Sequence, residues 1–268
     1  MKLTRNEEMI YAAKRINLEI TEISYGDLDP EWNIENLCAA FTRVYFPLEG
    51  EAILTFGDTT VPLLPGNIYI VPSGTNFSGF CPKSLQKIYV HLTLTRPDGS
   101  DLFFGLNRCV ILPHREETIA EAAALYRQGD IPSILKFKLL LHRLLDDALT
   151  LCPPKHCELR EYSELTKAAL AYIDSHLSAA LTISEIAAAL FVSKPVLQKC
   201  FREDLDKPMG RYIDDTLLAH AERDLLDPTL SIKEISDRLG YCDQFYFSRK
   251  FTEAHGMSPK RFRQLHQG

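Results

Sequence analysis

The sequence predicts an α+β chain of two domains, with strands and then helices in the N-terminal part and helices alone in the C-terminal part. Three observations predict this division. The hydrophobic period changes from two to about 3.6 residues around Glu116, which marks a change from strands to helices. Residues 152–161 contain two consecutive prolines and are typical of a linker. Beyond them, a set of helix signals repeats after about 50 residues.

Length and composition agree with two domains. The 268 residues are 46% hydrophobic and 25% charged, which excludes a disordered or collagen-like chain. At this length a single hydrophobic core is near its practical limit. No apolar run reaches the roughly 18 residues that a membrane helix needs, and charged residues follow Met1 where a secretory signal has an apolar segment. We therefore expect a cytoplasmic protein that does not enter a membrane.

Short strands are predicted in the first domain. Ile53–Phe56, Thr60–Leu64, Ile68–Val71 and Lys87–Leu94 are rich in β-branched and aromatic residues, with glycine or proline at the corners between them. Strands of this length and spacing are typical of a small sandwich or barrel.

Two helices are predicted next, over Glu116–Gly129 and Ser133–Leu151. The second helix has two apolar stripes, although a single packing surface needs only one, so we expect it to bury a second face. If the first stripe faces a second copy of the chain, replacing Leu141 and Leu144 by Glu is expected to separate the dimer into monomers. The stripes consist of Ile134, Phe137, Leu141, Leu144, Ala148 and Leu151, and of Leu135, Leu139, Leu145 and Leu149.

The repeat begins with two capping boxes, Thr182–Glu185 and Ser231–Glu234. In each, a hydroxyl caps the first turn while the glutamate returns to the cap amide. A short apolar pattern, a turn and a second helix follow in both copies. Three pairs of core positions then match: Leu197 with Phe247, Phe201 with Phe251, and Tyr212 with Phe262. Two short helices joined by a tight turn, present twice, predict two helix-turn-helix units.

The second helix of each unit carries cations and amides on the face that is expected to be exposed. Such side chains suit a helix that reads a DNA major groove, because cations bind phosphate and guanine and amides bind adenine. The net charge of −6 is not decisive, since Arg249–Arg263 contains five basic residues and one acidic residue. A helical repeat that binds protein is the alternative. The candidate DNA-binding residues are Lys194, Gln198, Lys199, Arg202, Asp243, Gln244, Tyr246, Arg249 and Lys250.

Ser231–Phe251, closed by Gly256–Phe262, resembles the signature of AraC/XylS-type transcription regulators. The resemblance implies a tandem helix-turn-helix domain over residues 162–268, with Met209–Leu226 joining its halves. It also implies a cupin-like β-barrel over residues 1–112 that senses an effector, followed by dimerisation helices over residues 113–151. The implied partners are double-stranded promoter DNA, a small molecule such as a sugar, a second copy of the chain and RNA polymerase.

The first unit departs from the family pattern. Asp206 occupies the place of Gly256, where the chain is expected to turn left-handed, a conformation that Asp tolerates better than most residues. Glu203 and Asp204 add further acid to the end of the first recognition helix. Leu217 stands where many members have arginine. We therefore expect the first unit to contribute less DNA affinity than the second.

A cupin-like barrel can also be a metalloenzyme. However, only His91 lies in the predicted strands, without His or Glu at ligand spacing, so we expect no catalytic residue, metal or cofactor. A barrel that only dimerises or binds protein is the other alternative. Aromatic and polar residues at inward strand positions, with one tryptophan before them, would suit a sugar or a small carboxylate. These candidate ligand-binding residues are Trp32, Arg43, Tyr45, Tyr69 and His91.

Overall fold

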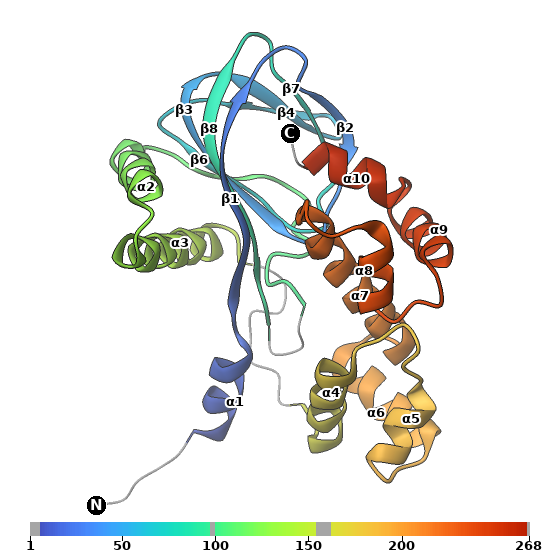
Figure 1. The fold of residues 1–268 in the computed structure, drawn as a ribbon. Coiled ribbons are helices and arrows are strands. Elements are labelled where there is room, and N and C mark those ends of the chain that lie inside the picture. Colours follow the sequence, from blue (N-terminus) through green and yellow to red (C-terminus); the bar gives the residue numbers. More distant parts are fainter. Residues whose placement is uncertain (1–5, 97–99, 154–161, 267–268) are drawn as a thin grey trace, which may run out of the picture. The chain divides into compact units, whose positions relative to one another are not determined.

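A computed structural model describes residues 6–96, 100–153 and 162–266, which form two compact units. The first unit contains the strands and two helices (Figure 1). Its elements are β1 (Leu18–Leu28), β2 (Asn33–Leu37), β3 (Thr42–Gly50), β4 (Ala52–Phe56), β5 (Thr59–Leu63), β6 (Ile68–Val71), β7 (Phe77–Phe80), β8 (Leu85–Leu94), β9 (Val110–Leu112), α2 (Glu116–Gln128) and α3 (Ile131–Leu151).

The second unit contains helices alone, as the sequence predicts for the C-terminal part. It also includes an N-terminal helix that is not expected from the sequence. The elements are α1 (Glu7–Arg15), α4 (Glu164–His176), α5 (Ile183–Ala189), α6 (Lys194–Leu205), α7 (Met209–Leu226), α8 (Ile232–Arg238), α9 (Gln244–His255) and α10 (Pro259–His266). Most of the expected linker, residues 154–161, lies outside the described residues.

The strands form two antiparallel sheets. One has the order β1-β8-β3-β6-β9 and the other β2-β7-β4-β5. No hydrogen-bonded strand pair joins the sheets within the described residues, so the expected barrel is an open sandwich, which still fits a cupin-like domain. The expected cupin-like sheet domain is thus present, but its two sheets are not closed into a barrel.

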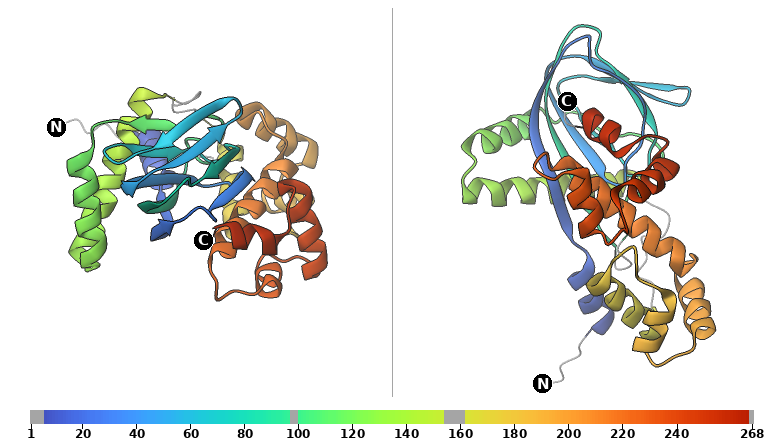
Figure 2. Two further views of the ribbon diagram at one scale, coloured as in Figure 1. Left: turned by 90° about the horizontal axis from the view of Figure 1, so that it is seen from above. Right: turned by 45° about the vertical axis from the view of Figure 1, so that its right-hand side comes forward.

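The hydrophobic core of this unit lies on one face of the five-stranded sheet. Side chains alternate between the two faces of a strand, so Val44 and Phe46 of β3 point the same way as Ile88 and Val90 of β8. This face packs against α2 and α3, as both views of Figure 2 show. The Phe46 and Phe137 rings lie 6.3 Å apart across this contact. The alternate residues of β3 and β8 point to the opposite face, toward the four-stranded sheet.

Helix α3 begins at Ile131, two residues before the expected start. Asp130 caps it by accepting the Ser133 amide at 2.9 Å, and Gly129 ends α2 in the left-handed conformation. Leu141 and Leu144 are 0% and 2% exposed and pack on the sandwich, so the condition that their stripe faces a partner is not met.

The exposed apolar residues of α3 lie instead near its N-terminus. The sequence shows that both stripes are apolar, but only the packing decides which residues of each stripe cover the sheet. The exposed residues are Ile131, Ile134, Leu135 and Leu139, with Leu151 at the C-terminal end.

The expected repeat is present in the second unit. Both capping boxes form, with the Glu185 amide bound to Thr182 and the Glu234 amide bound to Ser231. Asp206 has a φ of 53° at the end of α6, and Gly256 has a φ of 69° at the end of α9. The left-handed turn expected at Asp206 is thus confirmed.

Aromatic residues form the core of the second helix-turn-helix unit. The Phe251 ring lies 5.9 Å from Phe247 and 5.3 Å from Phe262, and all three residues are 0% exposed. In the first helix-turn-helix unit the Phe201 ring packs on the Tyr212 ring, with the ring centres 5.4 Å apart. No helix in the described part of the chain is long and apolar enough to cross a membrane.

Candidate DNA interface and sandwich site

Helix α9 presents its candidate DNA-binding residues because its buried face is fixed on the other side. Phe247 and Phe251 point into the core, while Arg249 and Lys250 are exposed. Asp243 accepts the amides of Phe245 at 2.8 Å and Tyr246 at 2.7 Å, which starts the helix at this point. The amide of Tyr246, with that of Phe245, holds the pKa of Asp243 below its ordinary value. The structure thus places Asp243 as a helix cap.

Arg249 is the best-placed cation for a base contact. Its guanidinium lies 5.7 Å from the Tyr246 ring and makes no ion pair with any residue in the described ranges. A surface hollow of about 430 Å³ surrounds it, lined by Phe245, Ser248 and Thr252. Lys250 lies 3.9 Å from Glu253, and Gln244 is half-buried at the start of the helix.

Helix α6 presents the corresponding face of the first helix-turn-helix unit. Leu197 and Phe201 are buried, and the candidate residues on the other side are exposed. Lys199 forms a long ion pair with Glu203, in which Nζ and Oε1 are 3.8 Å apart. The exposed candidates of this helix are Lys194, Gln198, Lys199 and Arg202.

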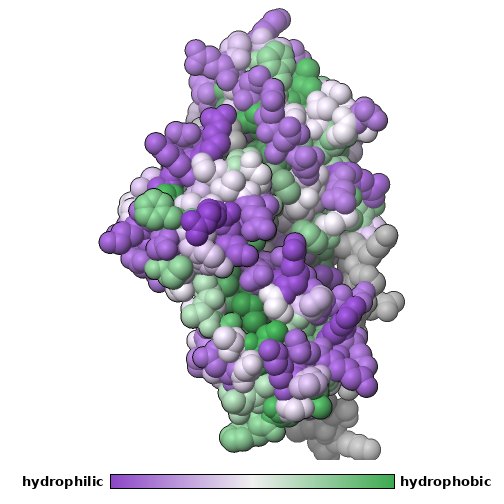
Figure 3. Space-filling model, turned by 90° about the vertical axis from the view of Figure 1, so that its right-hand side faces the viewer, coloured by the Kyte–Doolittle hydropathy of each residue, from purple (hydrophilic) through white to green (hydrophobic). Residues whose placement is uncertain are grey.

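One of the acidic side chains at the end of α6 is turned away from the exposed face of the helix. Asp204 turns toward α4 and accepts the Ser163 amide at 3.0 Å and its hydroxyl at 2.6 Å. Arg263 is likewise removed from the basic segment, since it donates to the backbone carbonyls of Leu225 and Leu230. Figure 3 shows the side of the molecule that carries α9, where hydrophilic residues surround small apolar patches.

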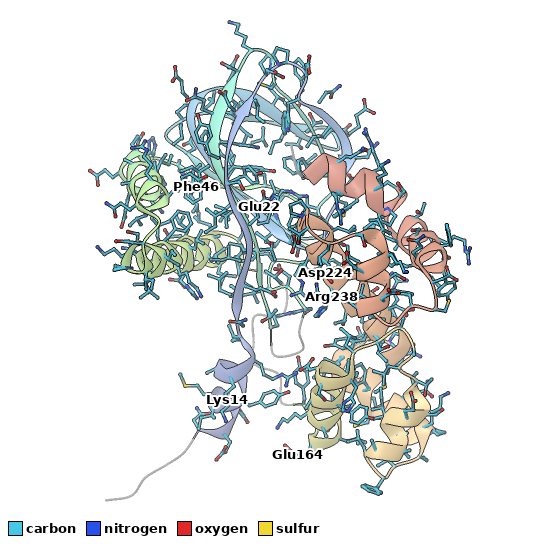
Figure 4. All side chains as sticks on the ribbon, in the orientation of Figure 1. Lys14, Glu22, Phe46, Glu164, Asp224 and Arg238 are labelled. Carbon is cyan, nitrogen blue, oxygen red and sulfur yellow. The ribbon has the colours of Figure 1, made fainter. Side chains whose placement is uncertain are left out.

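A second candidate site lies in the sandwich, on the sheet face opposite the hydrophobic core. Strand register places Arg43 beside His91, and Tyr45 beside both Tyr69 and Tyr89. Because these residues alternate with the core residues of β3 and β8, they share the face toward the four-stranded sheet. In Figure 4, Phe46 lies on the side of the sheet that α2 and α3 cover, and Glu22 lies on the side away from these helices. Arg43, Tyr45, Tyr69 and His91 are thus brought together.

Lys87 joins this group, although it is not among the residues expected from the sequence. It is only 5% exposed, and its Nζ lies 4.2 Å from the Tyr45 ring and 5.1 Å from the Trp32 ring. Tyr89 is the third ring, at 5.4 Å. Burial, and then the charge of Arg43, lower the pKa of Lys87 to about 7. Its place at an inward position of the strand predicted over Lys87–Leu94 was the signal that could have found it.

Glu22 of β1 contacts two residues of this face, His91 and Tyr89. Its Oε2 lies 2.9 Å from His91 Nδ1, and its Oε1 accepts the Tyr89 hydroxyl at 2.7 Å. Burial lowers the pKa of His91 to about 4, so the ring is neutral at pH 7. Burial also raises the pKa of Glu22, but the bonds from His91, Tyr89 and Ser24 outweigh it and leave that pKa below its ordinary value.

The remaining candidates border this group. Trp32 is half-buried before β2, and the absence of a side chain at Gly79 makes room for its ring, since an added Cβ would lie 2.5 Å from it. The Tyr69 hydroxyl accepts the Leu64 amide at 3.0 Å, so its polar end is occupied. Among the described residues no three His, Cys, Asp or Glu side chains are grouped to hold a metal.

Comparison with known proteins agrees with both parts of this arrangement. The family model described as a helix-turn-helix domain matches residues 186–265. The Msm operon regulatory protein of Streptococcus mutans is 27% identical over 82% of this chain and 83% of its own length. The HTH-type transcriptional activator Btr of Bacillus subtilis is 25% identical over 80% of this chain and 42% of its own length. The xylose operon regulatory protein of Escherichia coli is 31% identical, but over 47% of this chain and 35% of its own length.

The fold as a whole has a counterpart among solved structures. A crystal structure of ToxT from Vibrio cholerae aligns with a TM-score of 0.57, covering 92% of this chain and 99% of that one at 11% identity. Such a likeness shows the two-domain fold. With the paired capping boxes, the matched second helices and the family-model match, the chain is a transcription regulator of the AraC/XylS type, with a cupin-like N-terminal domain and a tandem helix-turn-helix DNA-binding domain.

Proposed function

We propose that the chain binds promoter DNA by placing α6 and α9 in successive major grooves, and that a small molecule bound in the sandwich alters this binding. The observation that carries the proposal is the pair of capped units whose second helices expose cations and amides opposite their buried aromatic residues. Successive major grooves on one face of a duplex lie about 34 Å apart, so the helix that joins the units, α7, sets the spacing that is read.

A sugar or another small metabolite is the effector class that relatives favour, since one of them is named for a xylose operon. We place the protein in the cytoplasm, where promoter DNA lies. RNA polymerase is the further partner that the family resemblance implies. An effector can shift DNA affinity only by its differential affinity for the two states of the protein.

Capture of genomic fragments by the full chain, followed by gel-shift titration with and without candidate metabolites, tests this function. We expect discrete fragments to be enriched and their affinity to change with one class of metabolite. Enrichment that does not exceed that of scrambled DNA would contradict DNA recognition, and affinity that no metabolite changes would contradict sensing.

We also propose that the exposed end of α3 forms the contact between two copies. Leu135 and Leu139 are 58% and 64% exposed on successive turns of one helix face. With Ile131 and Ile134 they form an apolar stripe, and such stripes on protein surfaces mark interaction sites. A second copy that offers the same stripe would bury it symmetrically.

Replacing Leu135 and Leu139 by Glu is expected to yield a folded monomer, because charge is then placed in the contact and not in the core. Lys136→Glu, on an exposed position of the same helix, is the matched control and should leave the dimer intact. Sedimentation velocity measures the outcome. A double variant that sediments as the wild-type dimer does would place the contact elsewhere.

A further inference from the structure

Two buried cations face the interior of the sandwich. Arg43 is 2% exposed and Lys87 is 5% exposed, on the neighbouring strands β3 and β8. In the register of these strands Arg43 lies opposite His91 and Lys87 opposite Pro47, with the Tyr45–Tyr89 pair between them. Burying a cation costs several kcal/mol unless an anion compensates for it, so the burial of Lys87 needs an explanation.

The carboxylate on this face is already occupied. Glu22 lies beside His91 and accepts bonds from Tyr89 and Ser24. Asp101, another buried carboxylate, accepts the Ser73 hydroxyl and the amides of Leu94 and Phe103.

Lys87 has no anionic neighbour of its own. Its Nζ makes no hydrogen bond or ion pair with any residue in the described ranges, and three aromatic rings surround it instead. Ring faces stabilise a cation, but they leave the three N–H donors of an ammonium without acceptors. An oxyanion supplies both the charge and the acceptors that the site lacks.

Trp32 packs between Lys87 and Gly79. Its ring is 5.1 Å from Lys87 Nζ and fills the space left by Gly79. Gly79 and Ile34 line a surface groove of about 280 Å³ that also includes Asn33, the residue after Trp32. The indole therefore lies beside Lys87 and is partly exposed to solvent.

We propose that the sandwich binds an organic anion, whose carboxylate or phosphate group contacts Lys87 and Arg43 while its carbon skeleton lies against Trp32 and Tyr45. This proposal rests on the effector-sensing function above and narrows its ligand class. A neutral sugar would fit the rings but would leave the Lys87 charge uncompensated.

Pairs of compounds in which a neutral group replaces the carboxylate test the proposal on the full chain: acetate with acetamide, benzoate with benzamide, and glucuronate with glucose. Glucose 6-phosphate and inorganic phosphate distinguish a phosphate from a carboxylate. Trp32 is the single tryptophan of the chain, so its fluorescence reports binding directly, and calorimetry confirms it. At constant ionic strength we expect the anion of at least one pair to bind at least about tenfold more tightly than its neutral counterpart.

Lys87→Met keeps the length of the side chain and removes its charge. We expect this variant to lose anion binding by about tenfold or more, and to unfold at a higher temperature than the wild type because a buried charge is gone. Lys83→Met is the matched control, since Lys83 is exposed in the turn before β8. It should bind anions as the wild type does.

The pH dependence of binding gives a second readout. The ionisable groups around Lys87 are Glu22, Arg43, Tyr45, Cys81, Tyr89 and His91, and the pKa of His91 is lowered to about 4. The pKa of Tyr45 is raised to about 12, those of Cys81 and Tyr89 are raised, and that of Glu22 is lowered, whereas that of Lys87 is about 7. Lys87 is charged below its pKa, so anion affinity should fall as pH rises through 7 to 9 in the wild type and stay level in Lys87→Met.

Three results would overturn the proposal: no anion of the set binds, the neutral partners bind as tightly as the anions, or Lys87→Met binds anions like the wild type. Each is separable from failure of the proposed function. A chain that recognises genomic DNA but binds no anion refutes the ligand class alone, whereas one that binds anions without recognising DNA refutes the regulatory function.

Discussion

Replacing Phe251 by Ala is expected to lower the free energy of unfolding of the C-terminal unit by about 3–5 kcal/mol. The ring is fully buried and touches Phe247, His255 and Phe262, so its removal leaves a cavity between α9 and α10. A loss of this size is a large part of the stability of an ordinary domain, which totals about 5–15 kcal/mol. The second recognition helix would lose its support, and DNA binding would fall with it.

Urea titration followed by circular dichroism measures this loss in the helical unit. Phe245→Ala is the matched control, because Phe245 belongs to the same helix but is 68% exposed. It should change stability by no more than about 0.5 kcal/mol. Trp32 reports the sandwich separately, and its transition should stay near that of the wild type. Equal destabilisation by both variants would contradict the assignment of the buried face of α9.

Arg249→Ala is expected to reduce affinity for a captured promoter site by about 1–3 kcal/mol, if the guanidinium pairs with a guanine. Affinity for scrambled DNA should fall much less, since a base contact carries specificity and phosphate contacts carry general affinity. Arg249 is exposed beside Tyr246, on the side of α9 opposite Phe247 and Phe251. The side chain therefore lies on the face of α9 that a contact with a base edge requires.

Gel-shift titrations of promoter and scrambled duplexes at one salt concentration measure this difference. Arg238→Ala is a suitable control, because Arg238 is an exposed cation on α8, 4.0 Å from Asp224, and lies outside the recognition helix. It should leave the ratio of the two affinities unchanged. If Arg249→Ala keeps the wild-type ratio, Arg249 does not read a base.

The helical part of the fold could be predicted from local sequence because local interactions decide it. A capping box closes within four residues, as at Thr182–Glu185, and the left-handed turn at Asp206 follows from its alignment with Gly256. Exposed and buried sides of α6 and α9 also follow from helical spacing. The nine candidate DNA-binding residues remain predictions, and one of them, Asp243, also caps α9.

The rest depended on contacts between distant segments. The apolar stripes of α3 are equivalent in sequence, and only packing on the sheet buries Leu141 and Leu144 while it exposes Leu135 and Leu139. Lysine is rarely buried, so sequence favours a surface position for Lys87. Its burial results from the meeting of β8 with β3 and with the segment that carries Trp32.

Hydroxyl-radical footprinting of the full chain on a captured promoter fragment tests the central claim most directly. Two helix-turn-helix units that read successive major grooves should protect two short stretches per chain, on one face of the duplex and about 10 base pairs apart. Arg249→Ala should weaken protection at one of the two stretches and spare the other. A single protected stretch, or protection spread evenly along the fragment, would contradict recognition by both units.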